Sequence, residues 1–189
     1  MTSLETPFAN AARLITRKNT FMQFRQPRTS DADDLLHYFN TLVQQDPERV
    51  ERPEDVRSIN HEKEVLWIES LLEKEKQQNA VTLCILKEEA IIGLGEIERR
   101  PRWIERHVAE IRFGLLPDHL DEGIELVKQL EERARAIGIE LLYYFHLATQ
   151  RQGIDIVRAC DFELAGTLGS YYKKADGYVD RVFYSKKII

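Results

Sequence analysis

Apolar residues recur along the chain at two spacings, and each spacing predicts a different kind of element. Apolar positions three or four residues apart predict helices at residues 29–45, 61–77, 121–137 and 153–160. Alternating or continuous apolar residues predict strands at residues 21–26, 80–87, 90–98, 107–116, 140–148, 162–168 and 179–187. The resulting order, β-α-α-β-β-β-α-β-α-β-β, indicates one α/β domain built on a mixed sheet.

Small and polar residues mark where these elements begin and end. Pro27 closes the first strand, Ser30 can cap the first helix, and Asn60 can cap the second. Gly138 ends the third helix, because glycine readily adopts the left-handed conformation that follows many helices. Residues 169–178, rich in glycine and tyrosine, are predicted to form a loop before the last strand.

The domain is predicted to span residues 22–189, preceded by an extension, residues 1–21, that either lacks order or docks as a helix. The chain has 43% hydrophobic and 31% charged residues, a composition typical of a soluble globular protein. No apolar run approaches the ~20 residues of a membrane helix. The net charge of −5 argues against binding to nucleic acid. Cys84 and Cys160 are isolated and the histidines lack metal-ligand spacing, so we expect a cytoplasmic protein with no disulfide and no metal site.

The stretch from residue 109 to residue 127 predicts a strand, a sharp turn and the start of a helix. A helix N-terminus offers backbone N–H groups and a favourable dipole to an anion, so this layout can hold a phosphate. However, Asp118, Asp121 and Glu122 stand where the phosphate would lie. The turn is therefore a working anion site, an eroded one, or a helix start that its aspartates cap.

Several segments resemble the GNAT family of acyl-coenzyme A N-acyltransferases. The likeness is sharpest in residues 99–117 and in the helix at 123–138, and residues 159–168 support it. It covers about residues 22–187. The resemblance implies a mixed, mostly antiparallel sheet of six or seven strands, flanked by about four helices. It also implies a splay between the fourth and fifth strands.

In this family the splay holds the pantetheine arm of acyl-CoA, and the turn after the fourth strand holds the pyrophosphate. The resemblance therefore implies acetyl-CoA as cosubstrate. The implied contacts come from the end of the fourth strand and the start of the next helix: Phe113, Gly114, Leu115, Leu116, Asp121, Glu122, Gly123 and Ile124.

The turn departs from the family pattern at two positions, which makes it a degenerate pyrophosphate turn. Asp121 stands at a family glycine, and Asp118 stands where the family has arginine or glutamine. A carboxylate 4 Å from a phosphate charge costs roughly 1 kcal/mol in bulk water and roughly 4 kcal/mol near a protein surface. An aspartate forced into a left-handed conformation costs on the order of 1 kcal/mol more. Two functions remain open: an N-acyltransferase that binds acyl-CoA through its backbone, or a non-catalytic binding or scaffold protein that has lost CoA.

The resemblance implies that Glu110 is the general base that takes a proton from the acceptor amine through water. Its neighbours along the strand are apolar. Glu96, on the neighbouring strand, is a second candidate. The alternative for Glu110 is a carboxylate on the strand surface that pairs with Arg112 or with an arginine of the preceding hairpin.

The family's tyrosine, which protonates the leaving thiolate, is absent because Val157 occupies its position. Either a water or another tyrosine takes this role, and the alternative for each tyrosine is a core or loop aromatic. The candidates are Tyr143, Tyr144, Tyr171 and Tyr172.

The acceptor is expected to be a primary amine of a small molecule or a peptide. Residues 46–58 lie where the family shapes its acceptor site, and their carboxylates suit a cationic amine: Asp46, Glu48, Glu51 and Glu54. The arginines around Trp103 either bind an acidic group or belong to a solvated hairpin: Arg99, Arg100, Arg102 and Arg106. An unpaired edge strand could also support a homodimer.

Overall fold

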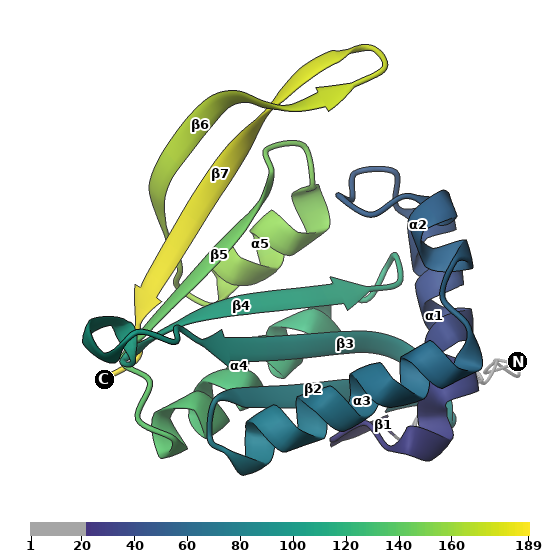
Figure 1. Cartoon of the computed structure of the whole chain (residues 1–189). Helices are drawn as coiled ribbons and strands as arrows, with labels where there is room; N and C mark the ends of the chain where they lie inside the picture. The colour runs from purple at the N-terminus through teal and green to yellow at the C-terminus, as the bar shows by residue number, and fades with distance from the viewer. Residues whose placement is uncertain (1–21) are drawn as a thin grey trace, which may run out of the picture.

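The computed structural model describes residues 22–189 and contains one mixed sheet of seven strands (Figure 1). The strands are β1 (Met22–Arg25), β2 (Ala80–Lys87), β3 (Ala90–Arg99), β4 (Val108–Leu115), β5 (Leu141–Leu147), β6 (Glu163–Lys174) and β7 (Gly177–Lys187). They lie in the order β1-β2-β3-β4-β5-β7-β6, and every neighbouring pair is antiparallel except β4 and β5. The predicted mixed, mostly antiparallel sheet is confirmed. The predicted N-terminal extension lies outside the described residues.

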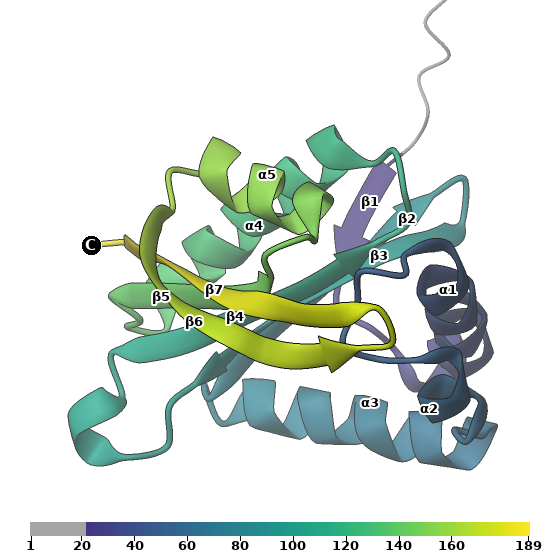
Figure 2. The same cartoon turned by 90° about the horizontal axis from the view of Figure 1, so that it is seen from above.

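Helices cover both faces of the sheet (Figure 2). They are α1 (Ala32–Gln45), α2 (Pro53–Arg57), α3 (His61–Lys76), α4 (Leu120–Ala136) and α5 (Arg151–Ala159). α1, α2 and α3 lie on one side, and α4 and α5 lie on the other. α2 is the helix that the pattern did not predict: it is one short turn inside the polar connection, and Pro53 opens it as proline often does.

Two hydrophobic clusters hold the helices to the sheet. The larger one joins the sheet to α4 and α5 through fully buried residues such as Ile111, Leu126 and Leu142. The smaller one joins the other face to α1 and α3 through residues such as Leu35 and Ile68. Because side chains alternate along a strand, the residues of β4 that flank Ile111 point to the α1/α3 side. This alternation decides which residues can line a site there.

β4 and β5 pair over only three residues, from Val108 opposite Leu141 to Glu110 opposite Tyr143. β4 then continues to Leu115 without a partner on that side, and the two strands diverge (Figure 1). The predicted splay between the fourth and fifth strands is confirmed. Its apex lies at Glu110.

The predicted loop at residues 169–178 is wrong, because β6 and β7 continue through it as a hairpin. Tyr172 pairs with Val179, Lys173 pairs with Tyr178, and Gly177 turns the chain with a φ of 145°. Figure 1 shows this hairpin reaching beyond the rest of the sheet. Both of its faces are largely exposed there, so the sequence carries none of the alternation that marks a half-buried strand.

Two of the three predicted helix signals are confirmed. The side chain of Asn60 accepts a hydrogen bond from the backbone N–H of Lys63, and Gly138 has a φ of 79° after α4. Ser30 does not cap α1, because it lies within a short 3-10 turn that precedes the helix and places Asp31 at the N-cap position. Asp31 accepts from both terminal nitrogens of Arg25, at 2.6 and 2.9 Å.

Replacing Asp31 by asparagine should lower the free energy of unfolding by about 2 kcal/mol at pH 7. Burial of Asp31 opposes ionisation, but Arg25 and the backbone N–H of Arg28 more than offset it and lower the pKa of this carboxyl. A lowered folded-state pKa gives stability that is present above the ordinary carboxyl pKa of roughly 4 and is lost as pH falls through the folded value. Urea unfolding at pH 7 and pH 3 should show the difference between the proteins shrinking in acid.

The matched control is Asp34→Asn, which removes the same charge from an exposed position in the first turn of α1. It should cost well under 1 kcal/mol. Equal losses for both variants would show that the Arg25 pair does not anchor this end of the sheet.

Candidate active site

The splay between β4 and β5 is nearly filled by side chains. Phe113 of β4 stacks on Tyr144 of β5, with ring centroids 5.2 Å apart. Arg49, from the connection between α1 and α2, closes the same space, which leaves a hollow of about 10 Å³. Such a volume holds about one water. A chain as wide as pantetheine therefore fits only if these side chains move.

Arg49 and His146 are two of the polar groups that line the splay and that the sequence did not reveal. The Arg49 side chain is only 12% exposed, its Nη2 lies 3.2 Å from Oε2 of Glu51, and its Nε has no hydrogen-bond partner within residues 22–189. Burial, and secondarily Arg49, lowers the pKa of His146 to about 4, so this ring is neutral at pH 7. Neither residue belongs to a motif, and only the fold brings them together.

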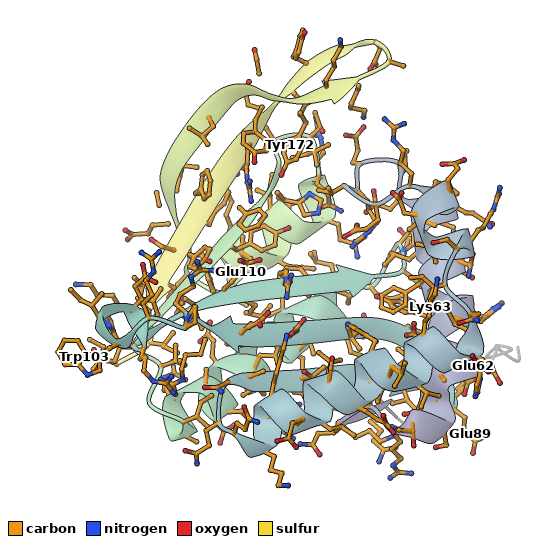
Figure 3. The ribbon with its side chains drawn as sticks, viewed as in Figure 1. Glu62, Lys63, Glu89, Trp103, Glu110 and Tyr172 are labelled. Atoms are coloured by element: carbon orange, nitrogen blue, oxygen red, sulfur yellow. The ribbon has the colours of Figure 1, made fainter. Side chains whose placement is uncertain are left out.

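Glu110 lies at the apex of the splay and makes two polar contacts (Figure 3). Tyr143 donates a hydrogen bond to Oε2 at 3.0 Å, and Nε of Arg112 lies 3.5 Å from Oε1. The expected apolar surroundings are wrong for this carboxylate, because its sequence neighbours Ala109 and Ile111 point to the opposite face of the sheet. Glu110 thus pairs with Arg112, as the alternative interpretation predicted, and it also lies at the splay.

Glu96 of β3 lies near Glu110 on the same face, and Arg112 joins the two. Glu96 is 7% exposed, its Oε2 accepts from Arg112 at 3.2 Å, and its Oε1 has no partner in the described part of the chain. Burial raises the pKa of Glu96, although Arg112 acts in the opposite direction. Arg112 also donates to Glu98 at 3.0 Å. Both predicted catalytic carboxylates are thus brought together around one guanidinium.

The turn after β4 presents two exposed aspartates to solvent. α4 begins at Leu120 after His119, and no side chain caps it by a hydrogen bond. Asp118 and Asp121 are both exposed and make no hydrogen bond to any other described side chain or to the described backbone, so the capping interpretation is wrong. The expected strain at Asp121 is also wrong, because it lies within α4. Asp118 instead has the left-handed φ of 66°, which aspartate tolerates better than most residues.

Glu122, the third acidic residue of the turn, is held by basic side chains. Nζ of Lys87 donates to its Oε1 at 3.0 Å, and Nδ1 of His119 lies 3.2 Å from the same oxygen. Burial opposes ionisation of Glu122, but the hydrogen bond from Lys87 helps lower its pKa overall. Lys87 was missed because it belongs to β2, 35 residues earlier in the chain.

The predicted cofactor residues divide into four groups. Phe113, Gly114 and Leu115 line the splay, and Asp121 and Glu122 lie in the first turn of α4. Leu116 and Ile124 are partly buried against the larger hydrophobic cluster. Gly123 is buried, and a Cβ there would lie 2.4 Å from Cδ1 of Ile156. Its small size therefore permits close packing of α4 on α5.

The tyrosine candidates occupy different environments. Val157, at the family's tyrosine position, is fully buried in the core. Tyr144 lies in the splay, where burial raises its pKa and keeps its O–H protonated. Tyr143 contacts Glu110, Tyr171 is exposed, and Tyr172 lies on the β6–β7 hairpin (Figure 3).

A cleft of about 370 Å³ lies between the α1–α2 connection and the β6–β7 hairpin, where the acceptor site was expected. Its charged lining includes Asp46, Glu51, Arg49, Arg52, Lys173 and Lys174. The acidic residues of the connection are mostly paired: Asp46 with Gln150, Glu48 with Lys174, and Glu51 with Arg49. Glu54 is exposed. The cleft thus offers cations as well as carboxylates.

The arginines around Trp103 support the hairpin fold. Arg99 donates to the carbonyl oxygens of Gln78, Arg106 and Ile137, and Arg106 donates to Asn79. Trp103 is 88% exposed and lies far from Glu110 and Tyr172 (Figure 3). These bonds to backbone and amide oxygens were not expected, because the two predictions were a bound acidic group and a solvated hairpin.

Residues 22–189 contain no group of three or more His, Cys, Asp or Glu side chains placed to hold a metal ion. Within the same residues, no helix is long and apolar enough to cross a membrane.

Comparison with known proteins supports the family resemblance. Residues 22–163 match the family model described as "Acetyltransferase (GNAT) domain". A GNAT acetyltransferase from Streptococcus pneumoniae superposes with a TM-score of 0.79 at 16% identity, over 89% of this chain and 100% of that one. A ribosomal-protein-alanine N-acetyltransferase from Brucella melitensis gives 0.71 at 23% identity, over 87% and 99%. A putative acetyltransferase from Salmonella typhimurium, solved with acetyl-CoA, gives 0.73 at 15% identity, over 89% and 94%. None of the curated proteins searched matches the sequence.

Replacing Gly123 by alanine should destabilise the protein by about 1 kcal/mol, although the same change inside a helix is usually stabilising by a similar amount. The new methyl would overlap Cδ1 of Ile156 at 2.4 Å. Ile156→Val removes that atom but leaves Cγ1 of residue 156 at 3.1 Å and Cδ2 of Leu115 at 3.2 Å, so the cost of alanine at position 123 should shrink in this second background. Urea unfolding of the four proteins in this cycle measures the coupling.

A stabilising effect of Gly123→Ala in both backgrounds would contradict the packing role. The remaining reason for a glycine at position 123 would then be that the backbone must come close to a phosphate.

Proposed function

We propose that this chain, which belongs to the GNAT acetyltransferase family, transfers an acetyl group from acetyl-CoA to a primary amine of a small molecule or a peptide. One observation carries the proposal: β4 and β5 stop pairing at Glu110 and Tyr143, and β4 then runs on to Leu115 and leads into the turn before α4. The backbone groups beyond this point lack strand partners, and buried backbone groups need partners. A pantetheine amide chain supplies such partners.

The backbone offers the proposed cosubstrate hydrogen-bond partners, whereas several side chains occupy the space that it would fill. The first N–H groups of α4 lack partners inside the helix and suit a pyrophosphate. Bound acetyl-CoA would supply an acyl group activated as a thioester. Arg49 and the stacked Phe113 and Tyr144 would have to move to admit its arm. Lys87 adds positive charge beside the turn.

Glu110 is the proposed base. Tyr143 and Arg112 orient its carboxylate, and its place at the apex of the splay would bring it near the carbon that an amine attacks. Glu96 is the second candidate, since its buried Oε1 has no partner among the described residues. Tyr144 is the proposed acid, because its protonated O–H lies in the splay itself.

The cleft beside the β6–β7 hairpin is the proposed acceptor site. Lys173 and Lys174 line it together with Arg52, so an amine acceptor that also carries a carboxylate would find partners there. The exposed edge of β6, with Leu164 and Leu168, is the proposed contact of a homodimer. The buried free thiols fit the reducing cytoplasm.

A non-catalytic GNAT-fold binding protein is the second candidate function. The filled splay and the two exposed aspartates of the turn favour it. Thermal-shift and calorimetric titrations with acetyl-CoA and free CoA test the first proposal directly. A ligand at 100 times its dissociation constant adds about 2.7 kcal/mol of stability. No shift at millimolar CoA would support the second candidate.

Replacing Glu110 by glutamine should lower kcat at least ~100-fold and leave the Kd of acetyl-CoA within about twofold, because a general base contributes ~100-fold or more. Turnover is measured as CoA thiol release with a panel of amino acids, polyamines and peptide N-termini. The matched control is Glu98→Gln, which also removes a carboxylate from Arg112 but lies on β3, opposite Glu110 and one strand further from β5.

The control should keep kcat within about threefold of wild type. If kcat fell equally in both variants, the loss would be due to a change in the position of Arg112 and not to the loss of a general base. Wild-type turnover in Glu110→Gln would exclude it as the base.

Replacing Asp118 and Asp121 together by asparagine should tighten CoA binding about thirtyfold, because each exposed charge near a phosphate costs about 1 kcal/mol and the two together cost about 2 kcal/mol. Asparagine also tolerates the left-handed φ at position 118. Calorimetry at low ionic strength measures the change, which should shrink in 0.5 M salt.

Asp33→Asn with Asp34→Asn is the control, since it removes two exposed charges from the start of α1. An equal gain there would reflect net charge alone. An unchanged affinity in the Asp118 and Asp121 variant would mean that the turn does not contact the pyrophosphate.

A further inference from the structure

A second cavity, of about 320 Å³, lies between α1, α2 and α3, away from the α4 turn. Its walls are mostly apolar and include two aromatic rings: Phe39, Leu42, Val43, Val56, Ile59 and Trp67. Ligand sites commonly combine such a volume with apolar walls and few polar groups. The polar groups of this cavity therefore indicate what it can bind.

Glu64 is the polar group that stands out. It lies on α3 one turn before Ile68, on the stripe that faces the core, and is 2% exposed. Its Oε1 is buried and has no hydrogen-bond partner anywhere in residues 22–189. Buried polar atoms are nearly always paired, so an unpaired carboxylate oxygen in a cavity wall points to a missing donor.

The charged neighbours of Glu64 are engaged elsewhere. Nζ of Lys63 donates to the carbonyl oxygen of Ser58 at 3.1 Å, and Arg49 pairs with Glu51 at 3.2 Å. Burial alone raises the pKa of Glu64 to about 7. The free carboxyl thus changes protonation near neutral pH, and a bound cation would favour its ionised form.

We propose that this cavity binds a small organic cation with an apolar body, an aryl- or alkylammonium, whose ammonium group donates to the carboxylate of Glu64. Phe39 and Trp67, with ring centroids 5.7 Å apart, supply aromatic surface for the body and the cation. Glu64 supplies the charge and the acceptor atom. The inference does not rest on acyl transfer, because binding alone tests it.

The two tryptophans of the chain provide the readout. Trp67 lines the cavity, whereas Trp103 is 88% exposed on the distant hairpin. Titration of the 15N-labelled protein with 2-phenylethylammonium chloride, without CoA, should shift the indole N–H signal of Trp67 and leave that of Trp103 in place. The uncharged probe 2-phenylethanol should bind at least tenfold more weakly.

Glu64→Gln should weaken binding of the ammonium probe at least tenfold, because the amide keeps the shape and loses the charge. Glu62→Gln is the matched control: it removes the same charge from an exposed position two residues earlier on α3, at the end of the helix shown beside α2 (Figure 3). It should bind within about twofold of wild type. Melting temperatures of both variants establish that they are folded.

The pH dependence supplies a test in the wild-type protein. With a pKa of about 7, roughly one tenth of Glu64 is ionised at pH 6 and roughly nine tenths at pH 8, so the probe should bind about tenfold tighter at pH 8. The exposed His61–Asp33 pair lies at the start of α3, and its effect on binding persists in Glu64→Gln. Equal binding by both glutamine variants, equal binding of both probes, or a pH-independent wild-type affinity would each overturn the proposal.

Discussion

The β4–β5 pairing ends after three residues, and the chemistry that this fold can support depends on that early end. Each strand is held along its other edge, β4 by β3 and β5 by β7, so the sheet stays intact while the two strands diverge. Divergence exposes backbone groups that neither strand can satisfy alone. The fold is shared with solved structures at identities of only 15 to 23%.

Two guanidinium groups organise the side chains around this opening. Arg112 contacts three carboxylates on one face of the sheet, including Glu96 and Glu110. Arg49 lines the splay, the cleft beside the β6–β7 hairpin and the cavity beside Glu64. A change in the position of Arg49 would alter all three spaces at once.

Local patterns predicted much of the fold. The apolar spacing gave α4 within one residue at each end, and Asn60 and Gly138 marked helix ends through their own backbone chemistry. The resemblance supplied the splay, which no periodicity encodes. The β6–β7 hairpin was mistaken for a loop because its residues are exposed on both faces and alternation carries no signal there.

The site was less predictable because its partners are distant in sequence. Lys87 reaches Glu122 across 35 residues, and Gln150 reaches Asp46 across 104. Glu64 was hidden among the charges of α3, although its spacing from Ile68 and Leu71 places it on the apolar stripe. A charged residue on the apolar stripe of a helix can be recognised from the sequence alone. The surroundings of its side chain are known only once the fold is known.

The acidic turn shows why charge counts alone are a poor guide to anion binding. Three carboxylates precede or begin α4, yet Glu122 is paired with Lys87 and approached by His119, whereas Asp118 and Asp121 face water. Because these two aspartates are exposed, the repulsion between each of them and a bound phosphate is close to the roughly 1 kcal/mol expected in bulk water. In a less polar environment the repulsion would be larger. The backbone N–H groups at the start of α4 remain oriented whatever the side chains are. Anion binding at this turn therefore depends on a balance between the backbone N–H groups, which attract an anion, and the two aspartates, which repel it. Salt screens the repulsion but not the short-range hydrogen bonds. The balance therefore favours binding most strongly at an ionic strength where the aspartates are screened.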